Sequence, residues 1–259
     1  MAQRSTHERR LEILELTAES GVSNVEALAE HLGVSPSTIR RDLAKLDDEG
    51  RLARTYGGAI AFSSHPESSI RQRSTEHYAA KDAIGRWAAS QVGQGETILL
   101  DGGSTTAAVA RALASTRDIT VVTAGLSALH ELIDAPGIEL ISLGGRLRAL
   151  SQSFVGPLAE VALERMSFDR VFMGTDGVTA DRGLCEATVE QTRLKELIMQ
   201  RSANVYVLAH GEKVGCRPFH AWAMPPASWT LVTDATADAQ ELEVFRSRGI
   251  DVVVAPQPE

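Results

Sequence analysis

The sequence lacks the features that place a protein in a membrane or outside the cell. Its 259 residues contain no apolar stretch near the roughly 18 residues that a membrane span needs. The opening "MAQRSTHERR" has no apolar run behind it, so we expect no secretory signal. The only cysteines are Cys185 and Cys216, which suggest neither a disulfide framework nor a metal site. We therefore expect a soluble protein of a reducing, bacterial-type cytoplasm, with no cofactor and no bound metal.

An excess of positive charge is missing too. The formal net charge is −8, and the 43% hydrophobic and 23% charged composition is that of an ordinary globular protein. Residues 1–60 hold eight Lys or Arg against ten Asp or Glu, so even this region is not basic. Non-specific binding of polyanions is therefore excluded as the main function. DNA binding by residues 1–60 requires that their few basic side chains gather on one face.

The first sixty residues nevertheless have the pattern of a helix-turn-helix. Apolar positions predict a first helix over residues 7–20. The segment "VSNVEALAEHLG" predicts a second helix, with Ser23 or Asn24 as its N-cap and Gly33 as its C-terminal stop. A third helix begins directly afterwards with Ser35 as its N-cap. In such motifs the helix after the tight turn enters the major groove of DNA.

The third helix separates an apolar face from a polar one. Ile39, Leu43 and Leu46 form one stripe at positions i, i+4 and i+7, which predicts that they face a core. The segment "RLARTYGGAIAF" then predicts two short strands about a Gly57-Gly58 turn, as in a wing. The alternative is a protein-interaction module of three solvated helices. We predict a winged helix-turn-helix over residues 1–60 that contacts double-stranded operator DNA through Ser35, Ser37, Thr38, Arg40, Arg41, Lys45 and Arg54.

A change of pattern divides the chain after this region. The polar segment "SSHPESSIRQR" has little periodicity, and we predict a linker over residues 61–74. From residue 75 to 259, strand patterns such as "TILLD", "ITVVT" and "RVFMGTDG" alternate with helix patterns. This alternation predicts an α/β fold with a mainly parallel sheet covered by helices on both faces.

The ends of the predicted strands carry the candidate binding residues. In "LLDGGSTTAAVA", a strand, two glycines and three hydroxyl residues lead into a helix, an arrangement that binds anions through backbone amides. It lacks the lysine of a Walker loop and is not G-x-G-x-x-G, which favours a sugar phosphate over a nucleotide. An ordinary glycine-rich turn is the alternative. We predict an effector site made of Asp101, Gly102, Gly103, Ser104, Thr105, Thr106, Asp176, Lys195 and Lys213, with Asp101 and Asp176 suited to sugar hydroxyls and the two lysines to the phosphate.

Both halves carry a family resemblance. The segment "VEALAEHLGVSPSTIRRDLAKLDDEGRLARTYGGA" resembles the N-terminal signature of DeoR-type bacterial transcriptional regulators. The pieces "DGGSTT", "VTAGLSA", "LGGRLR", "MGTDGV" and "LKELIM" resemble the effector domain of the same family, which shares its fold with ribose-5-phosphate isomerase. The resemblance implies a homo-oligomeric repressor, dimer or tetramer, of a sugar-catabolic operon. A phosphorylated sugar is expected to release this repressor from its operator.

The sequence departs from the family pattern at Tyr56 and at the three residues His210, Gly211 and Glu212. Tyr56 stands before the glycine pair where the family usually has histidine. The family's usual "DSSK" is "HGEK" here, so that His210 and Glu212 are new while Lys213 is kept. The contacts of this loop with an effector are therefore expected to differ from those of other members.

An enzyme remains the alternative function. A sugar-phosphate isomerase or deaminase-like domain tethered to a DNA-binding module would need a general base near the reacting carbon. Asp101, Asp176, Glu186 and Glu190 are candidates, and no spacing singles one out. The helix-turn-helix pattern and the family resemblance favour a sensor that is not an enzyme.

Overall fold

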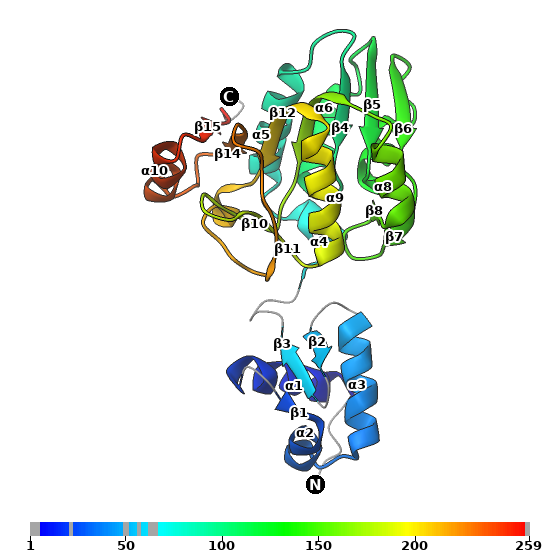
Figure 1. The fold of residues 1–259 in the computed structure, drawn as a ribbon, viewed down its shortest axis with the longest axis vertical. Coiled ribbons are helices and arrows are strands. Elements are labelled where there is room, and N and C mark those ends of the chain that lie inside the picture. Colours follow the sequence, from blue (N-terminus) through cyan, green and yellow to red (C-terminus); the bar gives the residue numbers. More distant parts are fainter. Residues whose placement is uncertain (1–5, 21–22, 49–51, 56–57, 62–66, 257–259) are drawn as a thin grey trace. The chain divides into compact units, whose positions relative to one another are not determined.

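The computed structural model describes residues 6–20, 23–48, 52–55, 58–61 and 67–256, in two compact units, 1–67 and 68–259 (Figure 1). Tyr56 and Gly57, the first residue of the predicted Gly57-Gly58 turn, lie outside the described residues. Among the helices described, none is both long enough and apolar enough to cross a membrane.

The first unit is a three-helix domain with a small antiparallel sheet. Its core holds Ile13 of the first helix together with Ile39, Leu43 and Leu46, each at most 1% exposed, so the predicted stripe faces inward. The sheet has the order β1-β3-β2, which provides the two strands of the predicted wing. The elements are α1 (Thr6–Ser20), β1 (Ser23–Asn24), α2 (Val25–Leu32), α3 (Pro36–Asp48), β2 (Leu52–Thr55) and β3 (Gly58–Ala61).

Local caps fix the turn between α2 and α3. The Asn24 side chain accepts a hydrogen bond from the Glu26 amide, so Asn24 is the N-cap of α2. Gly33 ends α2 with a φ of 64°, in the left-handed region that favours glycine, and its amide bonds back to carbonyls of the last turn. The turn is therefore tight, and α3 starts only three residues later, at Pro36.

The second unit is built on a seven-stranded parallel sheet of order β15-β14-β12-β9-β4-β5-β6 (Figure 1). Neighbouring residues of the central strands face opposite sides: Leu99 packs in one apolar cluster, and Ile98 and Leu100 in the other. The predicted mainly parallel sheet is confirmed. The strands are β4 (Thr97–Leu100), β5 (Ile119–Thr123), β6 (Ile138–Ser142), β9 (Phe168–Met173), β12 (Ser202–Leu208), β14 (Thr230–Thr233) and β15 (Asp251–Val254).

Helices cover both faces of this sheet. Residues of α5, α6 and α7 belong to one apolar cluster, and residues of α8, α9 and α10 belong to the other. The two-sided covering follows from the right-handed crossovers that parallel strands require. The helices are α4 (Ile70–Thr75), α5 (Tyr78–Ser90), α6 (Ser104–Leu113), α7 (Leu126–Leu132), α8 (Pro157–Leu163), α9 (Val189–Gln200), α10 (Ala239–Ser247) and the short 3-10 helix η1 (Gly211–Lys213).

Two small antiparallel sheets were not predicted. One has the order β10-β11-β13 and the other is the β7-β8 hairpin. They lie in segments between the main strands, and each of their strands has only three or four residues. Their bounds are β7 (Arg146–Arg148), β8 (Ser153–Val155), β10 (Gly177–Thr179), β11 (Gly183–Glu186) and β13 (Ala221–Ala223).

The predicted linker is too long at its C-terminal end. Residues 68–74, predicted as linker, belong to the second unit, and most of them lie in α4. Ile70 is 4% exposed and its amide donates to the Leu150 carbonyl at 2.8 Å. Arg73 is ion-paired with Asp176. These contacts come from residues far along the chain, which is why the polar local sequence did not indicate them.

Candidate functional site

The N-terminus of α3 gathers the hydroxyl groups predicted to contact DNA. Ser35 is the N-cap, because its Oγ accepts a hydrogen bond from the Thr38 amide at 3.2 Å. The same Oγ lies 2.8 Å from Ser37 Oγ and 2.9 Å from Thr38 Oγ1. Ser35 and Ser37 are exposed and Thr38 is half-buried. The cluster therefore offers several hydroxyls at the end of the helix that such motifs place against bases.

The basic side chains of α3 lie on its exposed faces. Arg40, Arg41 and Lys45 are all exposed, away from the apolar stripe. Arg40 forms an ion pair of 3.2 Å with Glu26 of α2, and both side chains are more than half exposed. Exposed pairs of this kind contribute about 0–1 kcal/mol, so Arg40 can exchange Glu26 for a phosphate. Arg54 lies in β2, and its side chain is outside the described residues.

A buried carboxylate that the sequence reasoning missed fixes the position of α3. Asp42 is 2% exposed and accepts hydrogen bonds from Arg9 Nε at 2.7 Å and from Arg10 Nε at 2.9 Å. Asp42 lies three residues after Ile39, and this i, i+3 spacing in the sequence could have predicted that its side chain faces inward with that of Ile39. The two ion pairs attach α1 to α3 and so position the exposed arginines of α3.

A small polar cleft in the second unit brings together most of the predicted effector residues. It opens where β4 and β9 end, the usual place for ligands in parallel sheets. Of the nine predicted residues, all except Asp101 and Thr106 line it. The lining residues are Arg73, Gly102, Gly103, Ser104, Thr105, Ser151, Gly174, Thr175, Asp176, Glu186, Gln191, Lys195 and Lys213.

The glycine loop after β4 presents backbone amides to this cleft. The first hydrogen bond inside α6 runs from the Ala107 amide to the Gly103 carbonyl at 3.0 Å. The amides of residues 104–106 therefore have no partner within the helix and carry the partial positive charge of its N-terminus. Gly102 is needed for packing, since a Cβ there would lie 2.1 Å from Ser153 Oγ. The loop has the form of an anion site.

Asp101 and Thr106 do not meet the cleft as expected. The Thr106 hydroxyl donates to the Gly103 carbonyl at 3.0 Å, and Thr106 is fully buried. Asp101 is 4% exposed, and its carboxylate accepts a hydrogen bond from Lys195 Nζ. In this arrangement the Asp101 carboxylate positions Lys195, and its contact with a sugar hydroxyl stays a prediction.

Lys195 is the centre of a buried charge cluster. Its Nζ also donates to the Gly174 carbonyl at 2.7 Å and lies 3.3 Å from Glu186 Oε1. Burial disfavours the charge on Lys195, but the carboxylates of Asp101 and Glu186 outweigh it, and the pKa of this ammonium is raised. Burial is also the main cause that raises the pKa of Glu186 to about 8, against the attraction of Lys195. Lys195 is therefore charged at neutral pH.

Two further cations reach the cleft from other elements. Arg73 of α4 donates from Nη1 to Asp176 Oδ1 at 2.8 Å, and both side chains are largely buried. Lys213 Nζ donates to the Thr175 carbonyl at 2.6 Å, and burial lowers the pKa of this ammonium. Arg73 was hidden from sequence reasoning because it lies in the predicted linker. The cleft thus combines helix amides with three basic side chains, a set suited to one phosphate.

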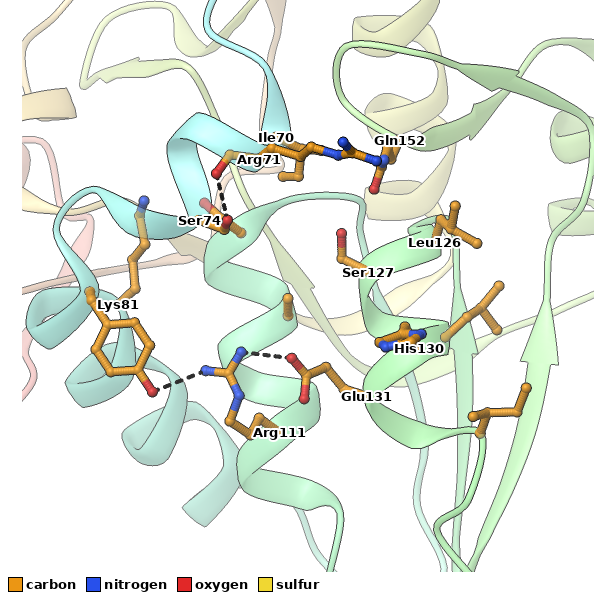
Figure 2. A pocket seen from close by; sticks show the side chains of 15 residues that line it. Ile70, Arg71, Ser74, Lys81, Arg111, Leu126, Ser127, His130, Glu131 and Gln152 are labelled. Atoms are coloured by element: carbon orange, nitrogen blue, oxygen red, sulfur yellow. Dashed lines mark hydrogen bonds and ion pairs between the residues drawn. The ribbon is translucent and has the colours of Figure 1, made fainter.

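A second, larger cavity of about 750 Å³ lies between α4, α6 and α7 (Figure 2). Its wall is mainly apolar and includes Leu126 and Ile133, and its polar centre is the Arg111–Glu131 ion pair of 2.7 Å. Ser104 lines both this cavity and the polar cleft. The larger cavity is also lined by Arg71, Lys81 and Arg111, but Arg111 is paired with Glu131 and Lys81 Nζ donates to the Glu76 carbonyl at 2.8 Å. We take the smaller cleft as the candidate anion site because it joins the glycine loop to the N-terminus of α6.

Comparison with protein families matches both units. Residues 9–65 match the DeoR-like helix-turn-helix domain, and residues 76–235 match the DeoR C-terminal sensor domain. The chain is 35% identical to the HTH-type transcriptional regulator GlpR of Haloferax volcanii over 247 residues, which cover 95% of this chain and 96% of that protein. It is 32% identical to the putative aga operon transcriptional repressor of Escherichia coli O157:H7, over 96% of this chain and 94% of that protein.

Solved structures give a more distant match. The ribose 5-phosphate isomerase A of Methanocaldococcus jannaschii is 18% identical to this chain, with a TM-score of 0.38. The matched region covers 51% of this chain and 52% of that one.

Proposed function

This chain belongs to the DeoR family of DNA-binding transcriptional regulators, and we propose that it represses genes of carbohydrate use until a phosphorylated sugar binds its second unit. The proposal takes its direction from relatives such as the aga operon repressor, which resembles the chain along nearly its whole length. The expected DNA contacts are the exposed hydroxyls and basic side chains of α3.

The observation that carries the effector proposal is the composition of the polar cleft. Free amides at the start of α6 meet Arg73, Lys195 and Lys213, which come from three different elements. Helix amides and basic side chains are the groups that proteins use to bind phosphate. The side chains of Glu186 and Gln191, joined by a hydrogen bond of 3.4 Å from Gln191 Nε2 to Glu186 Oε2, remain for the hydroxyls of the sugar.

We place the link between effector and DNA in α4. This helix is the first element after residue 67, where the DNA-binding unit ends, and its Arg73 is held by Asp176 in the cleft. A phosphate in the cleft competes with Asp176 for Arg73, because both are anionic. Binding therefore changes how α4 is held, and a coupling free energy of roughly 1–3 kcal/mol suffices for about 5- to 150-fold weaker DNA binding.

We also propose that the sensor unit does not catalyse a reaction. An isomerase or deaminase needs an available general base near the substrate, and four carboxylates are the candidates in the sequence. Asp101 is held by Lys195, Asp176 is held by Arg73, and Glu186 lies 3.3 Å from Lys195. Glu190 does not line the cleft and is paired with Arg146. None of the four candidates is thus prepared to remove a proton.

The chain is expected to act as a homo-oligomer, because helix-turn-helix proteins bind symmetric half-sites as dimers. Light scattering after gel filtration measures this directly. A monomer at concentrations that saturate the operator would contradict the expectation.

The experiment that tests the function has two stages. Thermal unfolding is first measured with a panel of sugar phosphates, the parent sugars and inorganic phosphate, since a ligand of the native state raises the melting temperature. The compound that stabilises the protein is then added to a complex with a fluorescent DNA fragment from the promoter of the chain's own gene. Release of DNA by a sugar phosphate, and not by its parent sugar, is expected. If only unphosphorylated sugars stabilise the protein, the phosphate assignment is wrong.

A further inference from the structure

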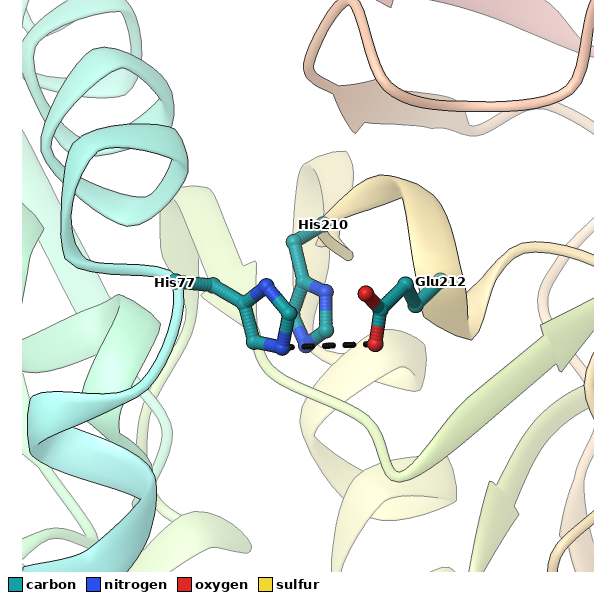
Figure 3. Close-up of side chains that lie close together, drawn as sticks. All are labelled: His77, His210 and Glu212. Atoms are coloured by element: carbon teal, nitrogen blue, oxygen red, sulfur yellow. Dashed lines mark ion pairs between the residues drawn. The ribbon is translucent and has the colours of Figure 1, made fainter.

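Three side chains with metal-binding chemistry meet beside the loop that departs from the family pattern. His77 lies in the turn between α4 and α5, while His210 and Glu212 lie at the start of η1, after β12. One ligand atom of each lies within 4.8 Å of the others, and His77 Nε2 is 3.3 Å from Glu212 Oε2. The two imidazole rings are stacked, with centroids 4.2 Å apart, and the carboxylate of Glu212 lies beside them (Figure 3).

His210 has the environment of a ligand rather than of a core residue. The residue is 6% exposed, and its Nδ1 is buried without a hydrogen-bond partner among the described residues. A buried polar atom in this state calls for an ion or a water to complete it.

The backbone at His77 directs its side chain into the same cluster. Its φ of 51° lies in the left-handed region, where residues with a Cβ are uncommon. His77 occupies the N-cap position of α5, but its side chain makes no capping hydrogen bond. The side chain instead stacks on His210 and contacts Glu212, so its placement does not serve the helix end.

We propose that His77, His210 and Glu212 form a binding site for one divalent transition-metal ion of the Zn²⁺ class. Two imidazoles and one carboxylate suit such ions, whereas Mg²⁺ and Ca²⁺ require mostly oxygen ligands. Ligand atoms at about 2.0–2.2 Å from a tetrahedral ion are roughly 3.3–3.6 Å apart, and the His77–Glu212 distance already fits this. The two ring planes are only 16° from parallel, so the rings must swing out of the stack before a nitrogen of each points at one ion.

The neighbouring charges limit the affinity but do not exclude the ion. Lys81 and Lys213 lie near His210, and both repel a cation. Each ammonium is held by backbone carbonyls, Lys81 by that of Glu76 at 2.8 Å and Lys213 by that of Thr175 at 2.6 Å. The carboxylate of Glu212 opposes this repulsion, and the imidazole nitrogens supply the selectivity for transition metals.

A bound ion would join two segments that reach the effector cleft. His77 follows α4, which carries Arg73, and Glu212 precedes Lys213, and both Arg73 and Lys213 line the cleft. The metal would therefore stabilise this part of the second unit whether or not an effector is present.

The test measures Zn²⁺ bound to the full-length protein without an affinity tag, by equilibrium dialysis and elemental analysis, with Mg²⁺ in excess. One ion per chain is expected. His77→Asn keeps a residue that tolerates the left-handed backbone, and Glu212→Gln changes a side chain that is 71% exposed. Each is expected to weaken Zn²⁺ binding at least about tenfold, since even changes around metal ligands weaken affinity that much.

Two control variants separate this site from other zinc ligands. His220→Asn removes an exposed histidine outside the cluster, and Cys216→Ser removes the exposed thiol four residues after Glu212. Both are expected to bind Zn²⁺ as the wild type does. Unchanged affinity in His77→Asn and Glu212→Gln, loss of binding in either control, or no stoichiometric binding by the wild type would each overturn the proposal. The wild type and Glu212→Gln, whose substitution is at the surface, decide the question even if His77→Asn fails to fold.

Discussion

Replacing Gly103 by valine is expected to abolish the response to the effector and to leave operator binding intact. Gly103 precedes α6 with extended backbone that any residue can adopt. A Cβ built there meets only Thr106 Oγ1, at an ordinary contact distance of 3.5 Å. The added side chain therefore enters the cleft that Gly103 lines, in front of the amides at the helix N-terminus. Gly103→Val is therefore expected to change the stability of the fold little, whereas its side chain blocks the phosphate from the amides of the helix N-terminus.

The size of the effect follows from the hydrogen bonds that are lost. Two bonds from backbone amides to a charged phosphate contribute about 1.5–3 kcal/mol each, so their loss weakens binding by at least about 100-fold. Gly103→Ala, with a single methyl group, is expected to give an intermediate loss. Gly102→Ala is the contrasting variant, because its Cβ would lie 2.1 Å from Ser153 Oγ and should lower the melting temperature instead.

The assay is fluorescence anisotropy of a labelled operator, titrated with the sugar phosphate that stabilises the wild type. The Gly103→Val protein should bind the operator normally and stay bound at ligand concentrations that release the wild type. Its melting temperature without ligand provides the control for folding. Release at the wild-type ligand concentration would refute the assignment of the phosphate to the N-terminus of α6.

Three other perturbations test separate parts of the account. Arg40→Ala and Arg41→Ala should each weaken operator binding. If the arginine contacts a base, the loss is roughly 1–3 kcal/mol and specificity at that base is relaxed; if it contacts a phosphate, the slope of log affinity against log salt concentration falls by about one unit. A double variant that binds like the wild type would exclude α3 as the recognition helix. Arg73→Ala removes the ion pair with Asp176 and should uncouple the units, so that the protein still binds operator but sugar phosphate no longer releases it; normal release in the anisotropy assay would contradict the role given to α4. Because burial raises the pKa of Glu186 from 4.5 to about 8, the native state keeps a proton that the unfolded chain has lost, and the free energy of unfolding should fall as pH rises through this interval. Glu186→Gln should flatten that fall in urea unfolding at several pH values, and an unchanged slope would show that Glu186 is not the group responsible.

Local patterns were sufficient where one segment decides its own structure. Asn24, Gly33 and Ser35 cap helices through bonds to amides or carbonyls within a few residues, so their roles can be inferred from neighbours in the sequence. The strand "TILLD" is apolar on both faces because helices cover both faces of a parallel sheet.

Local sequence patterns did not predict the structure of segments that are fixed by contacts with residues distant in the sequence. Ile70 and Arg73 looked like part of a polar linker, and only contacts with Leu150 and Asp176 make α4 a part of the second unit. The short strands of the small sheets have too few residues for a periodicity to be recognised, and pairing with a neighbouring segment defines them.

The sequence by itself determined the two kinds of domain, the helix after the tight turn and the glycine loop, because each rests on spacing within one segment. Only the tertiary structure decided that Asp101 is held by Lys195, 94 residues away. It also brought His77 to His210, where the sequence suggested no metal. From the sequence, these charged residues are expected to be exposed. They form ion pairs because the ends of parallel strands and the helices after them meet at one edge of the sheet, and no local pattern predicts which residues will meet there.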